Sequence, residues 1–185
     1  SPLTLIKPFN LSSSGSTQCL KKRLTKTNYE IKQINKKIKD GTFKENEKLL
    51  EAIQRVKNNN STLHLFCLMS DGGVHSHIDH IIYLMKKAHD AGIKNVYVHS
   101  FLDGRDVPPK SAKEFLSKLD AAKIPGVELG VVSGRYYAMD RDKNYNRVQL
   151  AYDALVYGKA PVKGLLEGMD ESYASKNIYN GGYKI

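Results

Sequence analysis

The chain has 185 residues, 41% of them hydrophobic and 26% charged, a balance typical of an ordinary globular protein that excludes a disordered or fibrous one. Its longest apolar runs are far shorter than the roughly 20 residues of a membrane span, and the N-terminus lacks the pattern of a secretory signal, so we expect a cytoplasmic protein without a membrane partner. Most of the net charge of +10 lies in residues 20–60, which contain 12 basic and 5 acidic residues. This segment has no set of aromatic residues on which nucleic-acid bases could stack. We therefore expect a solvent-exposed helix face and no nucleic-acid partner.

The first third of the chain predicts a tail followed by two helices. Residues 1–26 contain a Ser-rich run, which is typical of a flexible tail or linker. Thr27 and Glu30 form a capping box, and isoleucines then recur at helical spacing as far as Asp40. A second helix, with leucine, isoleucine and valine on one side, is expected to end at residues 58–60.

From residue 63 onward, strand and helix patterns alternate. Continuous apolar runs predict three strands, at residues 63–69, 96–102 and 127–132. The first run contains Cys67, which we interpret as a buried small hydrophobic residue. Helical stripes follow each strand and end near Gly92, Gly126 and Gly158. This order predicts the α/β class, with a three-layer α/β/α architecture and a largely parallel sheet.

The same patterns predict how the chain divides. We expect a tail or linker at 1–26, one domain at 27–158, and a C-terminal extension of the same domain at 159–185. The extension is interrupted by several glycines and gives no clear periodicity.

Polar residues follow each predicted strand at the point where it ends. His75 comes after the first strand, Arg105 and Asp106 after the second, and Arg135 after the third, with Arg141 a few residues later. Because the carboxyl ends of parallel strands meet at one edge of a sheet, these segments should converge there. Guanidinium groups match phosphate and carboxylate oxygens in pairs. Any one of these arginines alone could form an ordinary surface ion pair, but three such segments predict a site for a small multiply charged anion.

A rival interpretation concerns the segment His75-Ser76-His77-Ile78-Asp79-His80. It matches the H-x-H-x-D-H pattern of metallo-β-lactamases, in which imidazole and carboxylate groups bind zinc. The further ligands of that family lie well downstream, and no histidine follows His99 in this sequence. The apolar spacing also places the segment at the start of a helix, where Asp79 and His80 are ordinary capping or surface residues. A metallo-hydrolase stays open as an alternative function.

Three motifs resemble cofactor-independent phosphoglycerate mutase. They are LMSDGGVHSHIDH at 68–80, VYVHSFLDGRDVPPK at 96–110 and SGRYYAMDRD at 133–142, in the order found in that enzyme's inserted phosphotransferase domain. The likeness extends from about Thr27 to Gly158. It implies an isomerase of glycolysis and gluconeogenesis that interconverts 3-phosphoglycerate and 2-phosphoglycerate through a phosphoserine, with two manganese ions in its other domain.

The resemblance also implies roles for the residues at the sheet edge. His75 would bind the substrate's phosphate or glycerate. Arg105 and Asp106 would hold the glycerate hydroxyls and carboxylate, with Asp106 the candidate general base. Arg135 and Arg141 would clamp carboxylate and phosphate oxygens. The substrate-binding set is therefore His75, Arg105, Asp106, Arg135 and Arg141, with no metal ligand in this chain.

Parts of the family's machinery have no counterpart here. The sequence lacks the segment N-S-E-V-G-H that carries the nucleophilic serine, and the Asp/His segments that bind the metals. Further substrate-binding arginines and a lysine of the family have no match in residues 159–185. We therefore expect a substrate-binding part that is inactive alone and has the enzyme's missing phosphatase domain as its partner. A non-catalytic anion-binding module is the remaining alternative.

Overall fold

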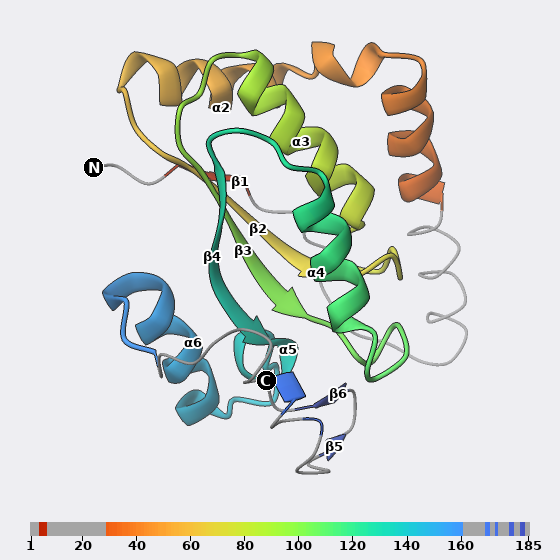
Figure 1. The fold of residues 1–185 in the computed structure, drawn as a ribbon, viewed down its shortest axis with the longest axis vertical. Coiled ribbons are helices and arrows are strands. Elements are labelled where there is room, and N and C mark those ends of the chain that lie inside the picture. Colours follow the sequence, from red (N-terminus) through yellow and green to blue (C-terminus); the bar gives the residue numbers. More distant parts are fainter. Residues whose placement is uncertain are drawn as a thin grey trace.

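A computed structural model describes residues 4–6, 29–160, 169–170, 173, 178–179 and 182–183 of the chain (Figure 1). Its main sheet has four parallel strands in the order β1-β2-β3-β4, so each strand pairs with the next one in sequence. The strands are β1 (Thr4–Ile6), β2 (Leu63–Met69), β3 (Val96–Leu102) and β4 (Val127–Gly134). The α/β class and the parallel sheet predicted from the sequence are confirmed.

Helices separate the strands. They comprise residues 29–39, η1 (Thr42–Glu45, a 3-10 helix), α2 (Glu47–Asn58), α3 (Ile78–Asp90), α4 (Ala112–Ala121), α5 (Arg135–Ala138) and α6 (Tyr145–Tyr157). Two short strands, β5 (Ile178–Tyr179) and β6 (Gly182–Tyr183), pair antiparallel. Within the described part of the chain, no helix has the length and apolar character needed to cross a membrane.

One face of the sheet forms the hydrophobic core. Alternate residues of β2 and β3 point into it, and helices α2, α3 and α4 cover it. The strand residues of this core are Leu63, Leu65, Cys67, Met69, Val96, Val98 and Leu102. Burial raises the pKa of the Cys67 thiol to about 12, so this side chain behaves as the small apolar residue that the sequence predicted. Helix α6 lies outside this core and contacts α5 and β4.

The opposite face of β2 and β3 carries aromatic rings instead. The His99 ring stacks on Phe66 and on His64, with ring centroids 4.6 and 5.1 Å apart, and Phe66 also contacts Phe101. The Nδ1 atom of His99 accepts a hydrogen bond from the Val131 N–H (3.1 Å), at the point where the β3–β4 register shifts. His99 therefore carries its proton on Nε2 and donates it to Nδ1 of His64, 2.8 Å away.

Two local predictions are wrong. Residues 1–26 were expected to be a flexible tail, but Thr4–Ile6 form β1, because the outer edge of β2 offers backbone partners to a β-branched, apolar segment. The rest of residues 1–26, and Thr27, lie outside the described residues. The Ser-x-x-Glu pattern of Ser111 and Glu114 also predicts a capping box. The Ser111 hydroxyl instead donates to the Pro108 carbonyl (2.7 Å) and caps no helix N–H.

The carboxyl ends of the strands gather at one edge of the sheet. Figure 1 shows β3 and β4 running toward α5 and the β5–β6 pair, and the turns that follow β2 and β3 lie at the same end. This is the edge at which parallel sheets bind ligands.

Candidate functional site

The turn after β2 is folded back onto its own strand. The Ser76 hydroxyl donates to the Leu68 carbonyl (2.5 Å), and the Ile78 N–H donates to the Ser70 carbonyl (2.9 Å). Gly73 adopts a positive φ of 65°, which glycine reaches without strain. These contacts leave Val74 and His75 exposed at the tip of the turn.

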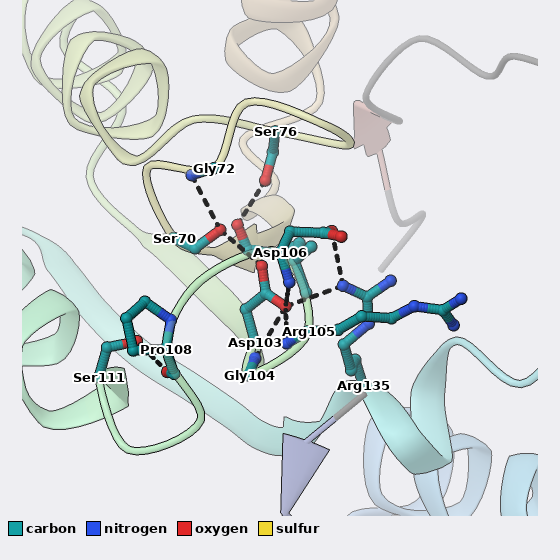
Figure 2. A network of polar contacts seen from close by, with 11 residues as sticks. Ser70, Gly72, Ser76, Asp103, Gly104, Arg105, Asp106, Pro108, Ser111 and Arg135 are labelled. Carbon is teal, nitrogen blue, oxygen red and sulfur yellow. Dashed lines mark hydrogen bonds and ion pairs between the residues drawn. The ribbon is translucent and has the colours of Figure 1, made fainter. Parts of the chain in front are cut away.

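Asp103 lies at the centre of the site, at the end of β3 (Figure 2). Its Oδ1 atom accepts hydrogen bonds from the backbone N–H groups of Gly104 (2.8 Å), Arg105 (3.0 Å) and Asp106 (3.2 Å). Its Oδ2 atom accepts from the Ser70 hydroxyl (2.8 Å). Burial works to raise the pKa of Asp103, but these hydrogen bonds and that of Arg135 outweigh burial and hold the pKa below its ordinary value. Asp103 is therefore a carboxylate near neutral pH.

Arg135 joins the end of β4 to this turn. Its Nη1 atom lies 2.8 Å from Oδ1 of Asp103 and 2.7 Å from Oδ2 of Asp106. Dashed lines in Figure 2 mark these two contacts. Burial tends to lower the pKa of Arg135, but the two carboxylates outweigh it and raise the pKa, so the guanidinium stays charged. Gly72 lets the two turns approach, because a Cβ atom there would lie 3.2 Å from both the Cβ and the carbonyl oxygen of Asp106.

His75 lies within the field of this charged cluster. His75 is exposed at the surface, but nearby protein atoms partly shield its ring from water, and this partial desolvation lowers the pKa of the ring. The positive charges of Arg135 and Arg141 lower the pKa further, while Asp106 and Asp103 raise it. The structure thus brings His75, Asp106, Arg135 and Arg141 together. At neutral pH the imidazole is uncharged, and it can donate one hydrogen bond and accept another.

Arg105 is placed differently from the other predicted residues. Its backbone N–H donates to Asp103 in the turn after β3. Its side chain is exposed and makes no hydrogen bond or ion pair with any residue that the structure describes. Arg141 is likewise exposed and without such a partner in the described ranges. Both guanidinium groups can therefore turn toward an anion without breaking an internal contact with the described residues.

The loop that carries Arg141 is organised by a second aspartate. The side chain of Asp140 is 3% exposed and accepts hydrogen bonds from the N–H groups of Asp142 (3.1 Å) and Asn144 (2.8 Å). It also pairs with Arg147, whose guanidinium stacks 4.0 Å above the ring of Tyr136. Hydrogen bonding, first from the Asn144 side chain, lowers the pKa of Asp140.

Comparisons with known proteins identify a family for this chain. Residues 34–180 match the family described as BPG-independent PGAM N-terminus. The chain belongs to this family. The 2,3-bisphosphoglycerate-independent phosphoglycerate mutase of Clostridium botulinum is 53% identical over 146 residues, which cover 77% of this chain and 29% of the relative. That of Listeria welshimeri is 53% identical over 128 residues, 68% of this chain and 25% of the relative.

A solved structure supports the same assignment. The crystal structures of Leishmania mexicana phosphoglycerate mutase at low cobalt concentration match with a TM-score of 0.67 and 28% identity, over 81% of this chain and 30% of that one. The chain thus spans less than a third of the length of each of these mutases, and its match to the family model lies at their N-terminal part.

The alternative metal site of a hydrolase finds no support in the geometry. His77 Nδ1 accepts from the Asp79 N–H (3.2 Å) and caps α3, while the carboxylate of Asp79 pairs with Lys118 (2.8 Å). His80 turns to Asn35, 2.6 Å away. In the described ranges, His, Cys, Asp and Glu side chains form no group of three or more that could hold a metal ion.

Sequence reasoning missed Ser70, Asp103 and Asp140 as parts of this mutase-family site. Asp103 follows the predicted strand 96–102 directly, but the sequence predicts no binding or positioning role for it. A usable signal was present, since an aspartate before glycine at a strand end tends to accept hydrogen bonds from the backbone two or three residues on. The partnership of Asp103 with Ser70 and Arg135 had no local signal, because these residues lie 33 and 32 positions away.

Proposed function

We propose that this chain is the substrate-binding part of a phosphoglycerate mutase and binds 2-phosphoglycerate and 3-phosphoglycerate at the edge formed by His75, Asp106, Arg135 and Arg141, with Arg105 beside it. The observation that carries the proposal is the meeting of uncharged imidazole, carboxylate and guanidinium groups from three different strand ends. Phosphoglycerate carries a phosphate, a carboxylate and a hydroxyl, and this set of groups can bind all three.

The three arginines are proposed to bind different parts of the anion. Arg135 is fixed by two carboxylates, so it offers its remaining donors in one direction. Arg105 and Arg141 are exposed, so they can close on the ligand from outside. A fixed guanidinium sets the position of one anionic group, and the two exposed ones neutralise the rest of the charge.

Asp106 is proposed as the general base for the accepting hydroxyl. Its Oδ2 pairs with Arg135, 2.7 Å away. A phosphate or carboxylate that binds the remaining donors of Arg135 would share its positive charge and so weaken the stabilisation of the Asp106 carboxylate by that charge. Substrate binding would then leave a carboxylate better able to accept a proton, at the point where a proton must be removed from the hydroxyl.

The whole reaction needs groups that this chain is proposed to lack. By family, the phosphoryl group is held on a serine in the phosphatase part, which would also hold two manganese ions, and this part would be the chain's partner. Manganese there would supply positive charge to the transferring phosphoryl group. The present chain would retain glycerate between the two transfers in a cytoplasmic, glycolytic enzyme, and alone it would be inactive.

Binding can be tested by an NMR titration of the 15N-labelled chain with 3-phosphoglycerate. We expect amide shifts near residues 75, 105 and 135. Arg141→Gln should weaken binding about tenfold or more, since charge-assisted hydrogen bonds are lost. The matched control Lys57→Gln removes a charge from the basic residues 20–60 and should change affinity less than about twofold. Shifts confined to residues 20–60, or equal effects of the two variants, would contradict the proposal.

Inactivity can be tested with the purified chain in a coupled enolase assay containing manganese. We expect no turnover of 3-phosphoglycerate above the blank. Sustained turnover by this chain would overturn the proposal that the catalytic serine and metals must come from another part of the enzyme.

A further inference from the structure

The carboxylate of Asp103 is fully committed to protein partners. Its side chain has 0% exposure, and its two oxygens accept five hydrogen bonds: three from backbone N–H groups, one from Ser70 and one from Arg135. An acceptor that is buried and saturated in this way has no means of contacting a ligand. Asp103 therefore acts on the site only through the groups that it holds.

Those groups come from the ends of three strands. Ser70 follows β2, the turn of residues 104–106 follows β3, and Arg135 begins α5 directly after β4. The Asp103 carboxylate thus fixes the distances between three turns. Along the chain, these turns are separated from one another by complete helices. A small anion contacts several of these turns at once, so errors in their spacing would directly reduce its affinity.

Among the groups that Asp103 holds in place, Arg135 is the most important for binding an anion. The side chain is 11% exposed, and among the described residues only its Nη1 has partners, both of them aspartates. Its Nε and Nη2 donors are then available to a ligand, in a direction fixed by the bonds at Nη1. Arginine side chains otherwise have large rotamer freedom, which a ligand would have to restrict on binding.

We propose that Asp103 is the positioning residue of the anion site: it touches no substrate, and it fixes the direction of the Arg135 guanidinium and the spacing of the turns around it. This inference rests on the proposed function for the identity of the anion. It assigns Asp103 a role that differs from that of Asp106, which is partly exposed and is proposed to contact the ligand.

The first test observes the guanidinium without any ligand, by 15N NMR of arginine side chains in the intact chain. In the native chain, Arg135 should give a resolved Nε–H signal and slow rotation about its Cζ–Nε bond. Asp103→Asn keeps the size of the side chain and an acceptor toward the backbone N–H groups, but removes the charge. We expect Arg135 to rotate measurably faster in this variant than in the native chain, because only Asp106 still pairs with it, while the matched control Asp79→Asn leaves Arg135 unchanged.

An Arg135 signal that is the same in the native chain and in Asp103→Asn would overturn the proposal. If Asp103→Asn fails to fold, Ser70→Ala provides a second variant, since it frees Oδ2 and leaves the charge in place. We then expect a partial increase in Arg135 rotation, and no change would count against the inference.

The second test measures how the effect reaches the ligand, with a double-mutant cycle for 3-phosphoglycerate affinity. We expect Asp103→Asn to weaken binding about tenfold and Arg135→Lys at least as much. Because the direction of Arg135 is the main route by which Asp103 is proposed to affect the ligand, the double variant should be within about twofold of Arg135→Lys alone. Independent, multiplying losses would show that Asp103 has only a general structural role, which overturns the proposal.

The two tests separate this inference from the proposed function. If the native chain binds no phosphoglycerate, the proposed function fails for this chain, while the rotation of Arg135 still decides whether Asp103 positions it. If the native chain binds and Asp103→Asn binds equally well, the function stands and the positioning role is wrong.

Discussion

The two faces of β2 and β3 are made from alternate residues of the same strands, yet different kinds of interaction stabilise them. One face presents aliphatic side chains to helices α2, α3 and α4, and none of these groups titrates near neutral pH. The other face presents stacked rings, with His64 and His99 joined by a hydrogen bond that requires both rings to be neutral. Stability from the first face is insensitive to acid, and stability from the second is not.

The largest effect should come from the aliphatic face. Leu65→Ala removes a fully buried side chain and should lower the free energy of unfolding by about 3 kcal/mol, from lost burial and the cavity left behind. His64→Ala, one residue away on the ring face, should cost about 1 kcal/mol, because His64 is only half-buried. Urea denaturation at pH 7.5 measures the free energy of unfolding of both variants. Equal losses of free energy would contradict the distinction between the two faces.

The next effect is a dependence on pH that belongs to the ring face. Burial, together with the neighbouring His64, lowers the pKa of His99 from 6.5 to about 4, so between these values the unfolded chain binds more protons than the folded one. Stability should therefore fall as the pH falls from 6.5 toward 4, by roughly 2 to 3 kcal/mol from this residue.

His99→Asn tests that assignment, since the amide oxygen can still accept from the Val131 N–H but the residue no longer titrates. We expect urea denaturation at several pH values to show a shallower loss of stability below pH 6.5 in this variant. The control His89→Asn, which replaces an exposed ring, should keep the native slope. An unchanged slope in His99→Asn would assign the acid sensitivity to other groups.

A smaller effect is expected where β4 meets the ring face. A Cβ atom on Gly130 would lie 2.8 Å from the His99 ring, so Gly130→Ala must displace the ring and weaken its bonds to His64 and Val131. We expect a loss of about 1 to 2 kcal/mol by thermal denaturation. Glu128→Ala, at an exposed position of the same strand, is the control and should differ little from the native chain.

The smallest effect concerns the outer surface of the helices that cover the aliphatic face. Lys118 of α4 pairs with Asp79 of α3 at 2.8 Å, and both side chains are about half exposed. Lys118→Ala should change stability by no more than about 0.5 kcal/mol, because solvent screens the pair. A loss of several kcal/mol would mean that α3 and α4 are held by this ion pair as well as by their apolar contacts.

Much of this fold could be predicted from the sequence. The bounds predicted for β2 and β3 agree with the structure, because continuous apolar runs between polar turns leave little choice of register. The end of α6 at Gly158 was also predictable, since that residue takes a positive φ of 64°. The pairing of Thr4–Ile6 with β2 was not, because it depends on a free strand edge nearly 60 residues away.

The candidate site was partly predictable for the same reason. The rule for parallel sheets identifies which turns meet, and the structure brings His75, Asp106, Arg135 and Arg141 together; their roles in binding stay a prediction. The rule does not say which side chain lies at the centre. That Asp103 is buried among donors from three strand ends follows from tertiary packing, which local sequence does not encode.

The bond between Asp103 and Arg135 also bears on how the protein is made. A ribosome releases the chain from its N-terminus, so Ser70 and Asp103 emerge before Arg135, which follows 32 residues after Asp103. Until it arrives, folding β3 into place would bury a negative charge without its cation, at a cost of about 3 to 5 kcal/mol. We therefore expect a chain that ends before Arg135 to be less stable than the longer chain, because the buried Asp103 would lack its cation.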